Sequence, residues 1–258
     1  MAHGSESDKY VGRPMKRRED RRLLLGSGTF VDDLRPGDCL SVVFVRSPHG
    51  HARITRLDVD GARKAPGVVA VVTGDEVRHL GPMAVNRAIP DMKVPPHPII
   101  AEGAVHATGV PVAAIAAETA TAAWDAAELI KVDYEELPAV PGPEAALVAG
   151  APVLYPEIEG NRSFRRVLKG GDPDDAFAGA AHRVSLRVAQ ERISAVAIEP
   201  RTVVASFDAV TEELTLWVSC QAPFRIRGEV ARLLELHESQ VRVIAPDVGG
   251  GFGVKTGP

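Results

Sequence analysis

Four glycines fall within five positions near the end of this chain, in the run Gly249, Gly250, Gly251, Phe252 and Gly253. The run follows residues 240–244, where β-branched side chains predict a strand. A segment with almost no side chains suits a backbone that turns sharply or that presents its N–H groups closely to a ligand. The fold must therefore accommodate a bare loop directly after a strand.

Three interpretations of this glycine loop compete. A turn between two strands needs only one or two glycines at positive φ, fewer than the loop contains. The nucleotide P-loop pattern G-x-x-x-x-G-K-[ST] fails at one position, because Val254 replaces the glycine before Lys255 and Thr256. A β-branched valine resists tight wrapping around phosphates. The third interpretation is a cofactor loop of another kind, which depends on the residues upstream.

The composition of the 258-residue chain, 45% hydrophobic and 25% charged, is that of an ordinary soluble globular protein. Its formal net charge of -4 argues against a nucleic-acid-binding surface. No apolar run approaches the roughly 20 residues that cross a bilayer, and the polar residues 1–20 lack the apolar stretch of a secretory signal. We therefore expect a cytoplasmic protein without nucleic-acid or membrane partners.

Cysteines and histidines give no sign of a metal centre. The two cysteines, Cys39 and Cys220, lie far apart and lack C-x-x-C spacing, so they predict neither a disulfide framework nor a zinc site. They are too few for an iron–sulfur cluster, and we expect both to be small buried side chains. His49 and His51 have no third ligand nearby in sequence and are interpreted as structural.

The first block of the chain predicts a mixed α/β domain. Apolar patterns predict strands at residues 40–46, 67–73, 110–116 and 130–134, and an alanine-rich helix at residues 118–129. Residues 82–98 are rich in proline and predict a long surface excursion. Prolines at intervals within residues 137–156 then predict a semi-rigid linker.

The second block begins where Asp172 suits the N-cap position of a short helix starting at Pro173. Strands are predicted at residues 182–190, 202–207, 213–219 and 240–244. An amphipathic helix is predicted at residues 224–236, with four apolar residues on one side: Ile226, Val230, Leu233 and Leu234.

The last two predicted strands decide where a ligand would bind. If strands 213–219 and 240–244 are parallel, the loops that follow them lie at one edge of the sheet, where open α/β sheets bind ligands. Gln221 would then lie beside the glycine loop and could donate a hydrogen bond to a ligand oxygen without adding charge. Its role as a residue at the start of the following helix is an equal alternative.

Five segments in a fixed order carry a resemblance to a known family: residues 46–54, residues 132–138, residues 199–201, Gln221 and residues 247–253. Together they resemble the large, molybdenum-binding subunit of the xanthine dehydrogenase/aldehyde oxidase family, in particular its carbon monoxide dehydrogenase-like members. The resemblance implies an α/β (α+β) fold, with an α/β hammerhead domain followed by the first part of a molybdopterin-binding domain.

The same resemblance implies domain boundaries and site residues. The boundaries are an N-terminal tail at 1–18, the hammerhead domain at 19–138, a linker at 139–162 and an incomplete molybdopterin-binding domain at 163–258. Gln221 matches a glutamine that hydrogen-bonds an oxo ligand of molybdenum, and Phe252 with Gly253 matches backbone near the metal, none of them as direct ligands. Gly249, Gly250 and Gly251 match the loop around the pterin.

No catalytic residue is assigned to this chain, because the family's general-base glutamate lies beyond residue 258. Glu199 is the one carboxylate we considered as a base, and its sequence context favours packing and an ion pair instead. Val254 departs from the family, which often has a small residue at that position. We therefore expect a chain that does not turn over substrate alone.

The function implied by the resemblance is that of part of a molybdenum hydroxylase. Its cofactor would be molybdopterin with molybdenum, in the cytosine dinucleotide form, and its substrate an aldehyde, an N-heterocycle or carbon monoxide, hydroxylated with oxygen from water. The implied partners are the remainder of the large subunit and subunits carrying iron–sulfur clusters and FAD. Two alternatives stay open: a non-catalytic scaffold for subunit contact, and a degenerate P-loop nucleotide binder.

Overall fold

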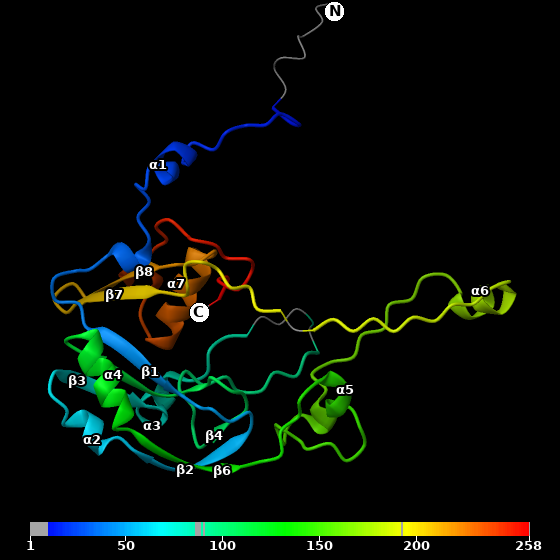
Figure 1. Cartoon of the computed structure of the whole chain (residues 1–258), viewed down its shortest axis with the longest axis horizontal. Helices are drawn as coiled ribbons and strands as arrows, with labels where there is room; N and C mark the ends of the chain where they lie inside the picture. Colours follow the sequence, from blue (N-terminus) through cyan, green and yellow to red (C-terminus); the bar gives the residue numbers. More distant parts are fainter. Residues whose placement is uncertain (1–9, 86–88, 90, 192, 258) are drawn as a thin grey trace, which may run out of the picture. The chain divides into compact units, whose positions relative to one another are not determined.

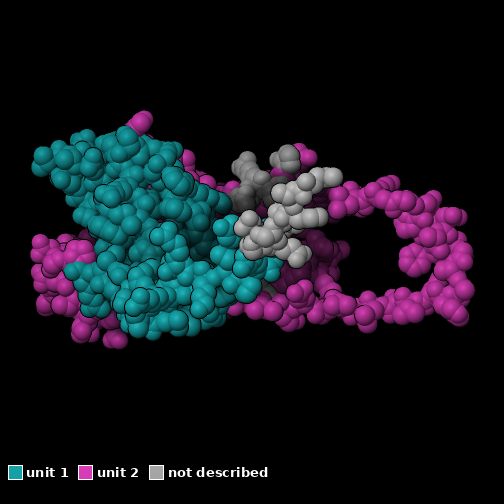
Figure 2. Space-filling view, turned by 90° about the horizontal axis from the view of Figure 1, so that it is seen from above, with its two compact units in different colours: residues 1–35, 195–228, 238–257 teal, residues 36–194, 229–237, 258 magenta. Residues whose placement is uncertain are grey.

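The computed structural model describes residues 10–85, 89, 91–191 and 193–257. They form two compact units (Figure 2), which are described separately. Unit 1 comprises Met1–Arg35, Ala195–Gly228 and Glu238–Gly257, and unit 2 comprises Pro36–Ser194 and Glu229–His237. Half of the predicted N-terminal tail, residues 1–9, lies outside the described residues, as do residues 86–88 and 90 of the predicted excursion.

Two antiparallel three-stranded sheets build unit 2 (Figure 1). The first sheet has the order β1 (Ser41–Arg46), β5 (Pro111–Ala117) and β3 (Val68–Thr73), and the second has the order β4 (Ala104–Val105), β2 (Ala52–Asp58) and β6 (Lys131–Glu136). Helix α4 (Ala120–Glu128) packs against the first sheet through the fully buried Ala123 and Ala126. Its N-cap residue Thr119 accepts a hydrogen bond from the Ala122 N–H, as a capping threonine should.

The central strand β5 explains where this core lies. Its residues Val112, Ala113, Ile115 and Ala117 are all fully buried, because neighbouring elements cover both of its faces. A strand buried on both faces is expected to read as a continuous run of small and apolar residues, as this one does.

Short helical turns complete the connections. They are α1 (Asp20–Leu24), η2 (Val31–Asp33), α2 (Asp60–Arg63), α3 (Gly74–Val77), η3 (Arg78–Leu80), α5 (Pro143–Ala146), η4 (Glu159–Asn161), α6 (Pro173–Gly179) and η5 (Glu238–Gln240). None of the helices in the described residues is long and apolar enough to cross a bilayer.

Unit 1 contains a third sheet, with the order β7 (Val203–Asp208), β8 (Glu213–Val218) and β9 (Val241–Ile244). Strands β7 and β8 are antiparallel, whereas β8 and β9 are parallel. Helix α7 (Pro223–Leu233) lies between β8 and β9 in the sequence, as a crossover between parallel strands requires. The predicted parallel pair is thus confirmed.

Most of the elements predicted from the sequence are confirmed, and three points are corrected. Residues 182–190 are not a strand: Val184, Leu186 and Val188 alternate as a strand would, but they are 77–91% exposed and pair with no strand in the described part of the chain. Strand β2 was not predicted, because its charged residues hide the alternation. Cys39 is exposed, and only Cys220 is buried as expected.

The two predicted helices of the second block form, with small differences. Asp172 caps α6 as predicted, accepting a hydrogen bond from the Asp175 N–H at 3.1 Å. Helix α7 has the predicted apolar residues Ile226 and Leu233 buried, but Leu234 is 43% exposed.

Candidate functional site

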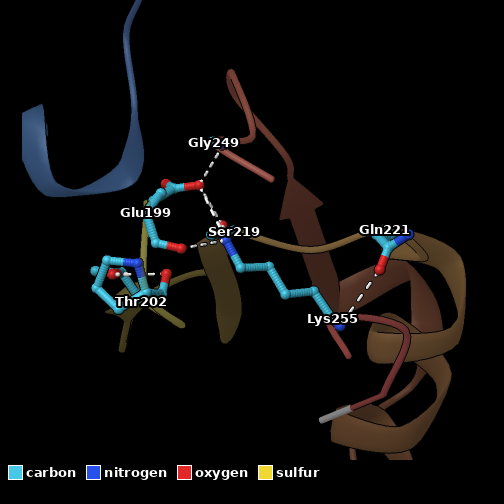
Figure 3. A network of polar contacts seen from close by, with 7 residues as sticks. Glu199, Thr202, Ser219, Gln221, Gly249 and Lys255 are labelled. Carbon is cyan, nitrogen blue, oxygen red and sulfur yellow. Dashed lines mark hydrogen bonds and ion pairs between the residues drawn. The ribbon is translucent and has the colours of Figure 1, made fainter. Parts of the chain in front are cut away.

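The parallel pair β8 and β9 brings two loops of unit 1 to the same edge of the sheet, because Trp217 pairs with Ile244 near both strand ends. The loop after β8 carries Gln221, and the loop after β9 carries the glycines. The Gln221 Oε1 atom accepts a hydrogen bond from the Lys255 N–H at 3.3 Å (Figure 3) and another from the Gly253 N–H at 3.0 Å. Gln221 therefore lies beside the glycine loop, as the sequence predicted.

The contacts of Gln221 also fix which way its carboxamide faces. Two N–H groups point at one end of the carboxamide, so that end must be the oxygen. The Nε2 end makes no hydrogen bond to any described residue, and Gln221 is exposed. Its amide hydrogens are therefore available to an oxygen atom of a ligand.

At Gly249 and Gly251 the backbone of the glycine loop approaches its neighbours too closely for a side chain. A Cβ atom on Gly249 would lie 2.5 Å from the Glu199 Cβ, and one on Gly251 would lie 2.4 Å from the Gln221 Cδ. Phe252 has a φ of +46°, a left-handed conformation that a bulky residue rarely adopts, and it is 75% exposed. Such strain is found mainly at functional sites.

Three successive N–H groups of the loop face no acceptor. Among the described residues, the amides of Gly250, Gly251 and Phe252 make no hydrogen bond, while the amides on either side are held by Glu199 and Gln221. Successive free N–H groups in a bare loop form a concavity that suits anionic oxygens. The loop can therefore bind a ligand through backbone donors.

A buried polar cluster lies behind the loop (Figure 3). Glu199 Oε2 accepts hydrogen bonds from the Gly249 N–H at 2.7 Å, from Ser219 Oγ at 2.5 Å and from Lys255 Nζ at 3.2 Å. Burial raises the pKa of Glu199, but the hydrogen bonds from these three residues outweigh it, so its pKa lies below the ordinary value. The ion pair predicted for Glu199 is confirmed, with Lys255 as the cation.

The position of Lys255 argues against a P-loop. Its side chain is only 1% exposed, and its Nζ atom donates to the Glu199 backbone oxygen at 2.8 Å and to Ser219 Oγ at 2.6 Å, besides pairing with Glu199 Oε2. The lysine of a P-loop must reach the phosphates of a nucleotide. This ammonium has its three donors directed into the protein instead.

Comparisons with known proteins agree with this geometry. Residues 25–138 match the family profile described as aldehyde oxidase and xanthine dehydrogenase, a/b hammerhead domain, and residues 154–258 match the molybdopterin cofactor-binding domain. The chain belongs to the xanthine dehydrogenase/aldehyde oxidase family. The predicted fold class, a hammerhead domain followed by molybdopterin-binding sequence, is confirmed.

Several family members are similar over nearly all of this chain. It is 38% identical to the gamma subunit of the 6-hydroxypseudooxynicotine dehydrogenase complex of Paenarthrobacter nicotinovorans, over 96% of this chain and 32% of that protein. It is 34% identical to the carbon monoxide dehydrogenase large chain of Hydrogenophaga pseudoflava, over 93% of this chain and 31% of that one.

A solved structure of the family is also similar to this chain in fold and sequence. The crystal structure of quinoline 2-oxidoreductase from Pseudomonas putida 86 matches with a TM-score of 0.88 and 38% identity, over 93% of this chain and 31% of that chain. The chain therefore spans about a third of the length of these family members.

One contact beside the glycine loop was not predicted from the sequence. The Asp247 carboxylate, just before the glycines, forms a two-pronged pair with the Arg22 guanidinium and accepts the Thr29 N–H at 2.8 Å. The hydrogen bond from Arg22 and then that from Thr29 lower the pKa of Asp247 to about 2. No local signal links residues so far apart in sequence, so only the folded unit reveals this anchor.

The histidines considered earlier have structural contacts. His51 is buried, and its Nδ1 atom lies 2.8 Å from the Pro138 backbone oxygen, whereas His49 faces Glu136 across 3.5 Å. Both precede β2 in the connection from β1. The described residues contain no group of three or more His, Cys, Asp or Glu side chains placed to hold a metal ion.

Proposed function

We propose that this chain forms the N-terminal part of a molybdenum hydroxylase large subunit and supplies one wall of its molybdopterin site. The proposed division is a tail at 1–18, the hammerhead domain at 19–138, a linker at 139–162 and molybdopterin-binding sequence at 163–258. The hammerhead match ends at residue 138, which supports the first boundary, whereas the molybdopterin-binding match begins at residue 154, within the proposed linker.

The observation that carries the proposal is the row of free donors along the loop. The amides of Gly250, Gly251 and Phe252 and the Nε2 atom of Gln221 are uncharged donors on one edge of the sheet, in a loop where Gly249 and Gly251 have no room for a Cβ atom. Such donors fit the oxo and phosphate oxygens of a molybdopterin cofactor. The residues present therefore fit the group that the family implies.

Each proposed site residue has a distinct part. Gln221 would donate to an oxo ligand of molybdenum, and the backbone of Phe252 and Gly253 would lie near the metal without coordinating it. Gly250 and Gly251 would follow the pterin. The Gly249 N–H is already bonded to Glu199, so Gly249 would contribute the shape of the loop rather than a hydrogen bond.

The proposed reaction is an oxidative hydroxylation. When bound, the molybdenum cofactor would take two electrons from the substrate as an oxygen atom from water is added to it. Relatives are named for 6-hydroxypseudooxynicotine, carbon monoxide and quinoline, which supports an aldehyde, N-heterocycle or carbon monoxide-type substrate. This chain would hold and orient the cofactor, and the general base would come from the rest of the large subunit.

The proposed partners follow from the same reaction. Electrons would leave through subunits carrying iron–sulfur clusters and FAD, and the cofactor would be the cytosine dinucleotide form. One relative is named as a subunit of a complex, which supports a multi-subunit assembly. We propose a cytoplasmic location, to be tested by cell fractionation.

The test is to purify the chain alone and together with the products of neighbouring genes. Molybdenum is measured by mass spectrometry, and the nucleotide released by acid hydrolysis is identified by chromatography. We expect molybdenum and cytidine monophosphate in equal amounts in the co-purified complex, hydroxylase activity in that complex and no turnover by the chain alone.

Other outcomes would decide against the proposal. Absence of molybdenum and cytidine monophosphate from both preparations would favour the non-catalytic scaffold. Molybdenum without cytidine monophosphate would contradict only the dinucleotide form. Thermal stabilisation of the chain by ATP would favour a nucleotide binder. The burial of Lys255 leads us to expect no such stabilisation.

A further inference from the structure

Lys255 contacts both residues that hold the glycine loop, Gln221 and Glu199. Its backbone N–H donates to Gln221 Oε1 at 3.3 Å, and its backbone oxygen accepts the Gln221 N–H at 2.8 Å. Its extended side chain runs from this position to Glu199 and Ser219 (Figure 3). One residue therefore fixes both the carboxamide on one side of the loop and the carboxylate on the other.

Glu199 holds the beginning of the loop in two ways. Its Oε2 atom accepts the Gly249 N–H at 2.7 Å, and its own backbone N–H donates to the Gly249 oxygen at 3.3 Å. The N–H groups that follow Gly249 stay free because these contacts end there. Hydrogen bonds thus hold the N–H groups of Gly249 and Gly253, whereas the three N–H groups between them make none among the described residues.

The buried ion pair of Glu199 and Lys255 is expected to add little to the stability of the fold, compared with apolar side chains. Glu199 is 8% exposed and Lys255 is 1% exposed, so both charges are removed from water. The Oε1 atom of Glu199 is buried and has no hydrogen-bond partner among the described residues. Apolar side chains often replace a buried ion pair without loss of stability, so stability alone does not explain this one.

We propose that Lys255 and Glu199 are positioning residues that hold the free amides of the glycine loop in register with Gln221, without touching the cofactor themselves. This inference rests on the proposed function, because it assigns the purpose of the register to cofactor binding. Ser219 takes part by donating to Glu199 and accepting from Lys255.

The test separates positioning from stability with three variants of the co-purified complex: Lys255→Met, Glu199→Met and the double variant. Each single change leaves one buried charge unpaired, so we expect a lower thermal midpoint. The double variant has no charge left in this cluster, and we expect its midpoint to recover most of that loss. Its molybdenum content should nevertheless stay at least about tenfold below wild type, as is usual when supporting residues of a metal site are removed.

Hydrogen exchange gives a readout that needs no cofactor. In cofactor-free protein, a peptide covering residues 245–254 should exchange faster in the single variants and in the double variant than in wild type. The control is Arg227→Met, which removes an exposed ion pair of unit 1 with Glu238. It should change neither the molybdenum content nor the exchange of residues 245–254. If a single variant does not fold, the exchange of residues 245–254 is measured in the double variant and in Ser219→Ala instead.

Two results would overturn the inference. One is a molybdenum content that returns to wild type together with the thermal midpoint in the double variant, because the cluster would then act only through stability. The other is wild-type exchange of residues 245–254 in both Lys255→Met and the double variant. If wild-type complex contains no molybdenum, the proposed function fails, whereas the exchange experiment still judges the positioning role.

Discussion

At the scale of single residues, the candidate site depends on distances too short for side chains. Gly251 faces the Gln221 side chain, where an added Cβ would lie 2.4 Å from Cδ. Sequence motifs assigned Gly251 and Gln221 to one site, but only the structure shows that their contact requires the glycine. The Gln221 side chain therefore packs directly against the backbone of the loop.

The first prediction concerns this contact. Gly251→Ala should push the Gln221 side chain aside and weaken its hydrogen bond from the Gly253 N–H. We expect the molybdenum content of the complex to fall at least about tenfold, with little change in the thermal midpoint because the loop is only partly buried.

The matched control is Gly37→Ala, since a Cβ there would meet nothing within 4 Å and its φ is not in the left-handed region. It should leave the molybdenum content unchanged. Full molybdenum loading of Gly251→Ala would show that the fit between Gly251 and Gln221 does not matter for binding.

At the scale of elements, the two blocks differ in how well sequence patterns predict them. Strand β5 and helix α4 were predicted because their apolar residues are buried within unit 2. Residues 182–190 have an equally regular alternation but no strand to pair with in the described part of the chain. Alternation describes what a strand could bury, whereas a sheet also requires a partner.

The second prediction tests the core around β5. Ile115 of β5 is fully buried in a cluster with Ala126 of α4, so Ile115→Ala should lower the free energy of unfolding of unit 2 by about 3 kcal/mol. Val69→Ala on β3, where the side chain is 58% exposed, should cost less than about 0.5 kcal/mol.

The two tryptophans, Trp124 and Trp217, lie in different units. A Trp217→Phe background therefore lets Trp124 fluorescence report urea unfolding of unit 2 alone. Equal losses in Ile115→Ala and Val69→Ala would mean that β5 is not the centre of this core.

At the scale of the whole molecule, the described residues of 164–194 form a long segment that belongs to no sheet. The segment includes α6, and its large apolar side chains, among them Leu168, Phe177 and Val184, are 47–91% exposed. Backbone with few buried contacts opens easily and is cut first by proteases.

The third prediction is that limited trypsin digestion of the chain cuts first within residues 165–187, which contain several exposed arginines and lysines. A fragment containing the two sheets of unit 2 should persist, as mass spectrometry of a time course would show. Changing Arg183 and Arg187 together to Gln should move the cut to other basic residues of this segment without slowing it. A first cut within β1, β2, β3, β5 or β6 would contradict the structure.

The sequence alone indicated the family and the position of the candidate site. Apolar periodicity predicted most strands and helices, since burial on one or both faces leaves a local pattern in the chain. The ordered motifs and the glycine loop identified the family, because a backbone that approaches a ligand closely must lack side chains.

Only the tertiary structure decided what supports that loop. Glu199, Ser219 and Lys255 are separated by 20 to 56 positions, and none of them carries a local mark of burial. In the sequence, Lys255 fitted a degenerate P-loop only as one alternative, and folding removes it from water and pairs it with Glu199. A lysine's environment is set by the chain segments that surround it, and these meet only when β8 and β9 pair in parallel.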